Sequence, residues 1–367
     1  MELENKLKIL MVIKSLKFWS WTENACVTVW NYLSNQGGCD VSYFLFYKEK
    51  NVYSHEWDEF CLWKKSKFLL WKLLHIFIWL LKLLKLCKTN KVDAMIAYMG
   101  SGILITLLSK LFRNKSKLYI TIHRSLSDFP RIIVKLFVYF SNKYSDKIIV
   151  LTESERDNLI NSYYVDRKKV LVIPNSIDIE KIVLLSKEPL ENYERIFNSK
   201  NFSFITVGRL EKIKNQELMV KTFTKLNEKY KNIQLIILWD WLEKTNLQKI
   251  ANNNVYFLWN QENVFKFLNK SDCFLLTSKS EAFPIAILEA MACSLPILST
   301  NIQWSREILD NGKYWILVDE DEYDLYQKME RILLDKDFKL YYTGKSKERV
   351  KMYHKDYVMK LRENLFK

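Results

Sequence analysis

The sequence is poor in the residues that usually form tight turns, metal sites and disulfide frameworks. Its 367 residues include seven glycines, five prolines and four histidines, and no His is spaced from another His or a Cys as metal ligands are. The six cysteines are scattered and contain no C-x-x-C pair. This pattern favours reduced thiols in a cytoplasmic protein. We therefore expect no dedicated metal site.

Long uncharged apolar runs are also missing. The first residues, MELENKLKILMVI, predict a buried strand and no signal peptide. The most apolar segment spans residues 66–88, and its longest uncharged stretch, Leu73–Leu81, is nine residues, too short to cross a bilayer. This segment predicts either a core helix or a helix in the membrane interface, with Lys65, Lys72, His75 and Lys82 on one face.

Positive charge is concentrated in one part of the chain. The net charge is +15, and residues 61–147 hold 17 Lys and Arg against three acidic residues. Such a region favours an anionic lipid surface, a nucleic acid or a phosphorylated substrate, or it is simply a solvated basic surface. Because it contains no known nucleic-acid-binding motif, we expect an anionic membrane surface and no nucleic acid.

Apolar strand-like runs alternate with helical segments along the whole chain. This alternation predicts α/β architecture with parallel sheets, and it restarts after IPNSID at residues 173–178. We expect two doubly wound Rossmann-like domains, residues 1–178 and 179–345, facing across a cleft. A helical segment at 346–367 would dock back on the first domain. Ligands bind at the carboxyl ends of such strands.

Two glutamates frame a predicted helix start at residues 280–296, SEAFPIAILEAMACSLP. Pro284 suits the first turn of a helix, which would place Glu281 in the loop and Glu289 one turn inside. The amides near Phe283–Ile287 would then form an anion site. Carboxylates beside it could accept hydrogen bonds from hydroxyls, so the stretch suits a nucleotide sugar, although a Glu pair at a helix start is usually a cap and a surface charge.

A second motif, VGRLEKIKN at residues 207–215, places cations after a predicted strand. Arg209 and Lys214 in a loop at a strand end can bind a diphosphate, although an ordinary basic turn has the same composition. The two motifs together are more specific than either alone.

These residues resemble the family 4 (group 1) retaining glycosyltransferases, which have the GT-B fold. VGRLEKIKN is similar to their phosphate-binding turn, and SKSEAFPIAILEAMA to their E-x7-E motif. The stretches VIPNSID (172–178), KILMVIKSL (8–16) and TIHRS (121–125) are similar to other parts of the family pattern.

The resemblance implies a role for each candidate site residue. Glu281 and His123 would be catalytic, beside the donor sugar. The donor diphosphate would lie against Arg209, Lys214 and the segment Phe283, Pro284 and Ile285, while Glu289 would bind the ribose. The family needs no bound metal, because cations and helix dipoles stabilise the leaving group. The resemblance also implies no cofactor, because the nucleoside-diphosphate sugar is a substrate.

Tryptophans stand where the family usually has glycine. They are Trp19 or Trp21 in the first loop, and Trp239, Trp241, Trp259, Trp304 and Trp315. A bulky side chain in a turn with positive φ would cost about 1–3 kcal/mol. We hypothesise that some are glycines in the native host, because UGA is read as Trp or as Gly in different recoded genomes; the alternative is a genuine tryptophan-lined protein with altered or lost activity.

The sequence therefore predicts a hexosyltransferase of cell-envelope polysaccharide synthesis. It would move a hexosyl group, with retention, from a nucleoside-diphosphate sugar to a hydroxyl of a lipid-linked or polysaccharide acceptor. We expect a cytoplasmic protein, peripheral on the inner face of the membrane. Two alternatives remain: a nucleotide-sugar epimerase on the same fold, and a catalytically impaired homologue that only binds the nucleotide sugar.

Overall fold

The computed structural model describes most of the chain. It covers residues 6–13, 21–35, 39–46, 69–123, 126, 129–197, 201–239, 244–259, 261–281, 283–363 and 365. Among the sequence predictions, those on Trp19, Trp241, Lys65 and the 61–68 part of the basic region lie outside these residues. The side chains of Trp21, Lys72 and Trp239 are likewise not described.

The chain divides into two compact units. Unit 1 comprises Met1–Asn175 and Met359–Lys367, and unit 2 comprises Ser176–Val358. The first division lies three residues before the position expected from the sequence. Of the expected C-terminal segment 346–367, only the last nine residues group with unit 1, because the second division falls inside the final helix.

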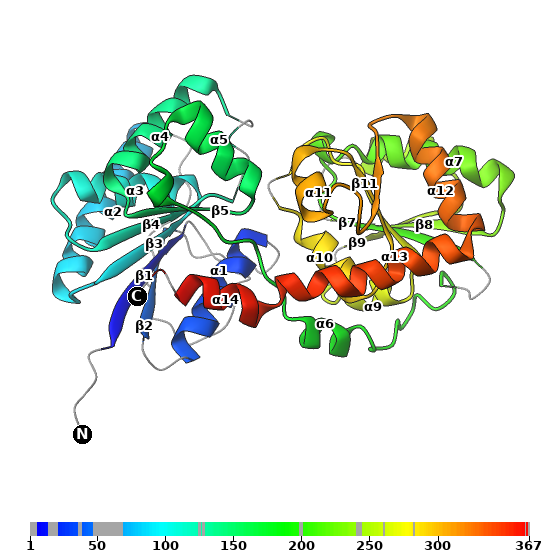
Figure 1. Ribbon diagram of the computed structural model, residues 1–367, viewed down its shortest axis with the longest axis horizontal. Coiled ribbons are helices and arrows are strands. Elements are labelled where there is room, and N and C mark those ends of the chain that lie inside the picture. Colours follow the sequence, from blue (N-terminus) through cyan, green and yellow to red (C-terminus); the bar gives the residue numbers. More distant parts are fainter. Residues whose placement is uncertain are drawn as a thin grey trace. The chain divides into compact units, whose positions relative to one another are not determined.

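Unit 1 is built on a parallel sheet of strand order β2-β1-β3-β4-β5-β6. Its strands are β1 (Leu7–Ile13), β2 (Cys39–Leu45), β3 (Ala94–Tyr98), β4 (Lys117–Thr121), β5 (Lys147–Val150) and β6 (Val170–Val172). Its helices are α1 (Trp21–Asn35), α2 (Leu69–Thr89), α3 (Met99–Leu111), α4 (Arg131–Tyr144), α5 (Glu153–Tyr163) and the 3-10 turn η2 (Arg167–Lys169). Helices α2 to α5 form one layer beside the sheet, and α1 lies on its other side (Figure 1).

Unit 2 repeats the plan with strand order β12-β11-β10-β7-β8-β9, again parallel. Its strands are β7 (Phe202–Val207), β8 (Ile233–Trp239), β9 (Val255–Trp259), β10 (Cys273–Leu276), β11 (Ile297–Thr300) and β12 (Ile316–Val318). Its helical elements are α6 (Ile179–Leu185), η3 (Lys212–Lys214), α7 (Gln216–Lys229), α8 (Lys244–Ile250), α9 (Phe265–Asn269), α10 (Ile285–Ala292), α11 (Gln303–Ile308), α12 (Glu322–Leu334), α13 (Lys336–Arg349), η4 (Val350–Tyr353) and the first four residues of α14 (Lys355–Glu363), whose remainder belongs to unit 1.

The central strands are buried on both faces, as a parallel sheet covered by helices requires. Strand β3 is buried throughout its length, and so are five consecutive residues of β7. The first turn of α3 also packs tightly on β1, because a Cβ at Gly102 would lie 2.6 Å from the carbonyl oxygen of Val12. Only glycine fits there.

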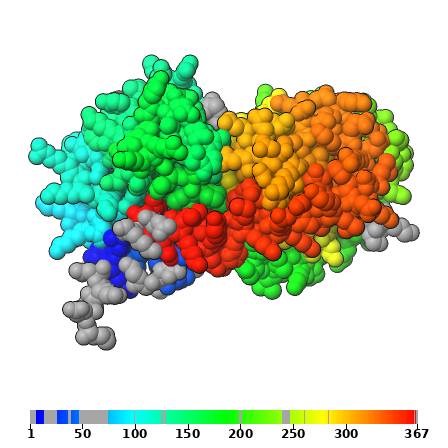
Figure 2. Space-filling model, viewed as in Figure 1, coloured from blue at the N-terminus to red at the C-terminus, as the bar shows by residue number. Residues whose placement is uncertain are grey.

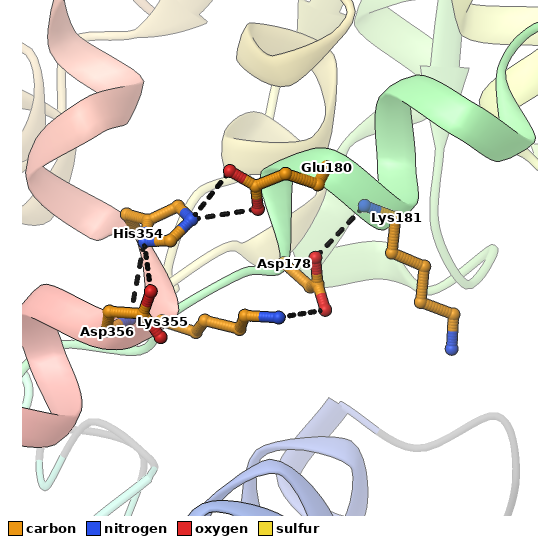
Figure 3. Close-up of polar contacts among 6 residues, drawn as sticks. All are labelled: Asp178, Glu180, Lys181, His354, Lys355 and Asp356. Atoms are coloured by element: carbon orange, nitrogen blue, oxygen red, sulfur yellow. Dashed lines mark hydrogen bonds and ion pairs between the residues drawn. The ribbon is translucent and has the colours of Figure 1, made fainter.

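The two segments that connect the units are tied together within unit 2 (Figure 3). Ile177 pairs with His354 in a parallel bridge. Asp178 caps α6 by accepting from the amide of Lys181 at 3.0 Å, and it also accepts from Lys355 Nζ at 2.6 Å. Glu180 contacts His354 Nε2 at 2.9 Å. The first connection is therefore held against the second by backbone and side-chain contacts.

The tryptophans whose backbone is described do not occupy strained turns. None of Trp239, Trp259, Trp304 and Trp315 has a positive φ. Trp315 is fully buried and its Nε1 donates to Ser346 Oγ at 2.6 Å, while Trp304 is 5% exposed. The backbone strain expected from the sequence is therefore absent at these four positions. By contrast Ser294 has a φ of 65°.

Candidate donor site

The candidate donor site of unit 2 lies after the carboxyl ends of β7 and β10. Gly208 follows β7 directly, and a Cβ added there would meet nothing within 4 Å, so the backbone of this turn borders open space. Arg209 follows it with a side chain that is 64% exposed and paired to Glu211 at 2.7 Å. This exposed cation can therefore turn toward a ligand at little cost.

Lys214 is held in place by the loop after β10. Thr277 Oγ1 donates to the carbonyl of Asn215 at 2.9 Å, and the amide of Lys279 donates to the carbonyl of Ile213 at 2.8 Å. The Lys214 side chain is 19% exposed and forms a short ion pair with Glu281. Two loops that are far apart in sequence thus bring the predicted cation and the predicted carboxylate together.

Glu281 is partly buried and its contacts converge on one oxygen. Oε1 accepts from both Lys214 Nζ and Ser278 Oγ, the latter at 2.8 Å. The other oxygen, Oε2, takes no part in these two contacts. A bound diphosphate would compete for Lys214, and it would leave Glu281 able to accept a hydrogen bond from a sugar hydroxyl.

Helix α10 follows the same loop and begins as the sequence predicted. Pro284 occupies the N-cap position, and no side chain caps the helix. Unpaired amides at a helix N-terminus attract anions through both hydrogen bonding and the helix dipole. Phe283 and Ile285, on either side of Pro284, are both buried, so an anion would meet backbone there and not polar side chains.

Glu289 lies on the second turn of α10 and is 7% exposed. Its Oε2 is buried and has no hydrogen-bond partner in the structure described. Burial raises the pKa of Glu289 to about 8, because the charged form loses its hydration. A buried carboxyl without a partner is costly, and a ligand with hydroxyl groups would satisfy it.

His123 belongs to unit 1, where it follows β4. Its ring lies 5.6 Å from that of Tyr98, and its Nε2 is buried without a partner. Burial lowers the pKa of His123 to about 3, with a further contribution from Arg362, so the imidazole is neutral at pH 7. The structure places the other seven predicted site residues in unit 2.

Sequence reasoning missed several polar residues around these sites. Ser278 and Thr277 were passed over because their contacts depend on how the loop after β10 folds. Gln216 Nε2 donates to the carbonyl of Arg209 at 2.8 Å and so fixes the turn after β7. Their nearness to Glu281 and Arg209 in the sequence was the available signal. Within the described residues, no group of His, Cys, Asp and Glu could hold a metal ion.

Comparisons with known proteins agree with this architecture. The family model "Glycosyltransferase Family 4" matches residues 30–181, and the model "Glycosyl transferases group 1" matches residues 190–354. The crystal structure of Anabaena HepE in complex with UDP and glucose superposes with a TM-score of 0.81 at 16% identity, over 98% of this chain and 99% of that one. The fold is therefore GT-B.

Two sequence relatives are also glycosyltransferases. An uncharacterized glycosyltransferase of Methanocaldococcus jannaschii is 36% identical over 62% of this chain and 60% of its own length. The second is the N-acetylgalactosamine-N,N'-diacetylbacillosaminyl-diphospho-undecaprenol 4-alpha-N-acetylgalactosaminyltransferase of Campylobacter jejuni, 25% identical over 75% of this chain and 76% of its own length. With both family models matched in turn along its two halves, the chain belongs to the family 4, or group 1, glycosyltransferases.

Proposed function

We propose that the protein transfers a hexosyl group from a nucleoside-diphosphate sugar to a hydroxyl of a lipid-linked or polysaccharide acceptor, with retention of the anomeric configuration. The observation that carries this proposal is the grouping of Lys214 and Glu281 beside the uncapped start of α10, with Glu289 buried on the same helix. Cation, amides and carboxylates together suit a ligand with a diphosphate and several hydroxyl groups.

Each group has a distinct role in the proposed reaction. Arg209 and Lys214 neutralise the diphosphate and stabilise the negative charge that develops on the leaving group. The amides near Phe283, Pro284 and Ile285 contribute the positive end of the helix dipole. Glu289 binds the ribose hydroxyls and Glu281 the donor sugar. No divalent ion is needed in this scheme, so transfer should persist in the presence of EDTA.

The acceptor side of the proposal draws on the relatives and on the charge of unit 1. The Campylobacter relative acts on a diphospho-undecaprenol-linked sugar, which supports a lipid-linked acceptor and a role in cell-envelope polysaccharide synthesis. In this proposal His123 is catalytic and lies beside the reacting sugar as a neutral imidazole. We place the protein in the cytoplasm, on the inner face of the membrane.

A membrane surface is proposed on the helical layer of unit 1. Among the described helices, none is long and apolar enough to cross a bilayer. Helix α4 instead exposes large apolar side chains, with Ile132 at 71% and Leu136 at 57%. It carries three cations and no acidic residue. The space-filling view shows part of this layer at the molecular surface (Figure 2). Apolar residues among cations suit the headgroup region of an anionic membrane.

Helix α2 has one face in the core of unit 1 and apolar side chains on an exposed face. Trp79 and Leu83 belong to the core of unit 1, whereas Phe77 and Leu81 are more than half exposed. Lys82 is exposed beside them. Because α2 packs on α3 and α3 on α4, the exposed apolar residues of these helices belong to one layer. We propose α4 as the main contact with lipid and α2 as its flank.

Titration with a panel of nucleoside-diphosphate sugars tests the proposed function. We expect one of them to bind and to release its nucleotide when an acceptor is added. Product analysis without acceptor separates transfer from epimerisation, and the anomeric configuration of the product tests retention. Binding without turnover on any acceptor would favour the impaired homologue. If no sugar nucleotide binds, the assignment of the donor site is wrong.

A further inference from the structure

Unit 1 contains a buried arginine that forms no ion pair with any carboxylate of the described residues. Arg362, near the end of α14, is 2% exposed, and its Nε and Nη1 make no hydrogen bond in the structure described. Arg156 and Arg209, by comparison, each pair with a carboxylate. Burying an unpaired charge costs several kcal/mol, so a guanidinium kept in this state indicates a missing anionic partner.

Two further polar groups without partners lie beside this arginine. Arg362 is close enough to Tyr98 and His123 to act on the pKa of both. The Tyr98 hydroxyl and His123 Nε2 are buried, and neither makes a hydrogen bond of good geometry. The ring centroids of Tyr98 and His123 are 5.6 Å apart. Three polar groups thus lie together in one buried region, and no two of them form a hydrogen bond of good geometry.

At neutral pH all three groups can donate hydrogen bonds. Burial raises the pKa of Tyr98, so its hydroxyl keeps its proton. The neutral imidazole of His123 carries one N–H. The guanidinium adds five N–H donors in a planar fork, a geometry that fits phosphate well. Three groups that can each donate a hydrogen bond, one of them a cation, match an anion better than a neutral sugar.

The cluster lies where ligands bind in sheets of this kind. Tyr98 ends β3 and His123 follows β4, both at the carboxyl edge of the parallel sheet. Tyr98 is also the N-cap residue of α3, which no side chain caps. Gly100, in the first turn of that helix, is exposed, and a Cβ added there would meet nothing within 4 Å. Open space therefore borders the helix end nearest the cluster.

We propose that Arg362 and Tyr98, which lie next to His123, form a subsite that binds a phosphate group, and that in the reaction this phosphate belongs to the acceptor. The second half of this statement rests on the proposed function, in which a lipid-linked acceptor carries a diphosphate. The first half does not depend on it. The subsite would hold the acceptor by its phosphate, leaving the acceptor hydroxyl to reach the donor.

Calorimetric titration with inorganic pyrophosphate tests the subsite in the full chain. Because pyrophosphate would also occupy the proposed donor site, the titrations use an Arg209→Gln, Lys214→Gln background. We expect one binding event to remain in this background. Arg362→Gln should weaken it about 10- to 100-fold, the effect of losing a charge-assisted hydrogen bond. Tyr98→Phe should weaken it several-fold, and the hydroxyl it removes makes no contact needed for folding.

The matched control is Lys360→Gln, an exposed residue of the same helix. It removes the same charge and should leave the affinity for pyrophosphate unchanged. The proposal is overturned if the background binds no pyrophosphate, if Arg362→Gln and Tyr98→Phe both bind as the background does, or if Lys360→Gln weakens binding as much as Arg362→Gln. The same titration with farnesyl diphosphate identifies the source of the phosphate. Tighter binding than that of pyrophosphate indicates a lipid diphosphate, and equal or weaker binding indicates free phosphate. Sugar-nucleotide binding to the wild type is measured separately, so failure of the proposed donor site is distinguishable.

Discussion

Replacement of Glu289 by Gln should change how the stability of the protein depends on pH. Glu289 is 7% exposed, and desolvation raises its pKa from 4.5 to about 8. Between these two values the folded protein holds a proton that the unfolded chain releases. The unfolding free energy therefore falls as pH rises through this window, and the loss is complete above pH 8.

The size of the effect follows from the two pKa values. Each pKa unit corresponds to about 1.4 kcal/mol, so a shift from 4.5 to about 8 costs the wild type about 5 kcal/mol at alkaline pH. Between pH 5 and pH 8 the loss is about 3 to 4 kcal/mol. Gln has nearly the same shape and does not titrate. The variant should therefore gain this amount relative to the wild type over the same range.

Urea denaturation at pH 5, 6, 7 and 8, at constant ionic strength, measures this difference. Glu228→Gln is the control, because Glu228 is an exposed residue of α7 and its removal should shift the unfolding free energy equally at every pH. A constant difference between Glu289→Gln and the wild type across the series would refute the reasoning. It would mean that the carboxyl is hydrated, or paired, in the folded protein.

Three other predictions concern the donor site, the membrane surface and the tryptophans. Lys214→Ala and Glu281→Ala should each reduce transfer about 100-fold or more, while the circular dichroism spectrum stays unchanged. The control Lys279→Gln, at an exposed neighbouring lysine, should retain activity. Near-wild-type turnover of either alanine variant would remove the site assignment. Changing Arg131, Lys135 and Lys143 to Glu should weaken binding to anionic vesicles about 100-fold, at roughly 1 kcal/mol per cation. The same change at Lys249, Lys270 and Lys351 of unit 2 should leave vesicle binding unchanged. Equal sedimentation of both variants with the vesicles would contradict the α4 surface. Trp315→Gly should lower the unfolding free energy by about 3–5 kcal/mol, because it empties a fully buried site; a glycine form that is equally stable, together with UGA codons at 239, 241, 259, 304 and 315, would support glycine in the native host.

The strands that the sequence predicted best are those with continuous apolar runs. β3 and β10, for example, are buried along their whole length. The edge strands β2 and β12 have no comparable apolar run. The first half of β2 is only partly buried and includes Asp40 and Ser42, and β12 has three residues. An edge strand with one neighbour buries less surface, so its apolar pattern is weaker.

The candidate donor site was predictable because its residues lie in two short segments, each with a strand, a turn and a helix start. Pro284 fixed the start of α10, and the preceding loop carried Glu281. The burial of Glu289 and its raised pKa were not predictable, because burial of a helix residue depends on what packs around it. Arg362 gave no local signal either. Its importance comes from chain segments that meet only after folding, and composition alone does not reveal them.

The paired connections between the units have a consequence for how the chain responds to cutting. Ile177 and His354 pair through their backbones, and Asp178 and Lys355 reinforce the pairing through their side chains. A protease that nicks one connection would leave the other intact, and the cut end would stay bound to its neighbour. Because Met359–Lys367 fold with unit 1, a chain nicked in the first connection should migrate as one species under native conditions and as fragments in denaturant.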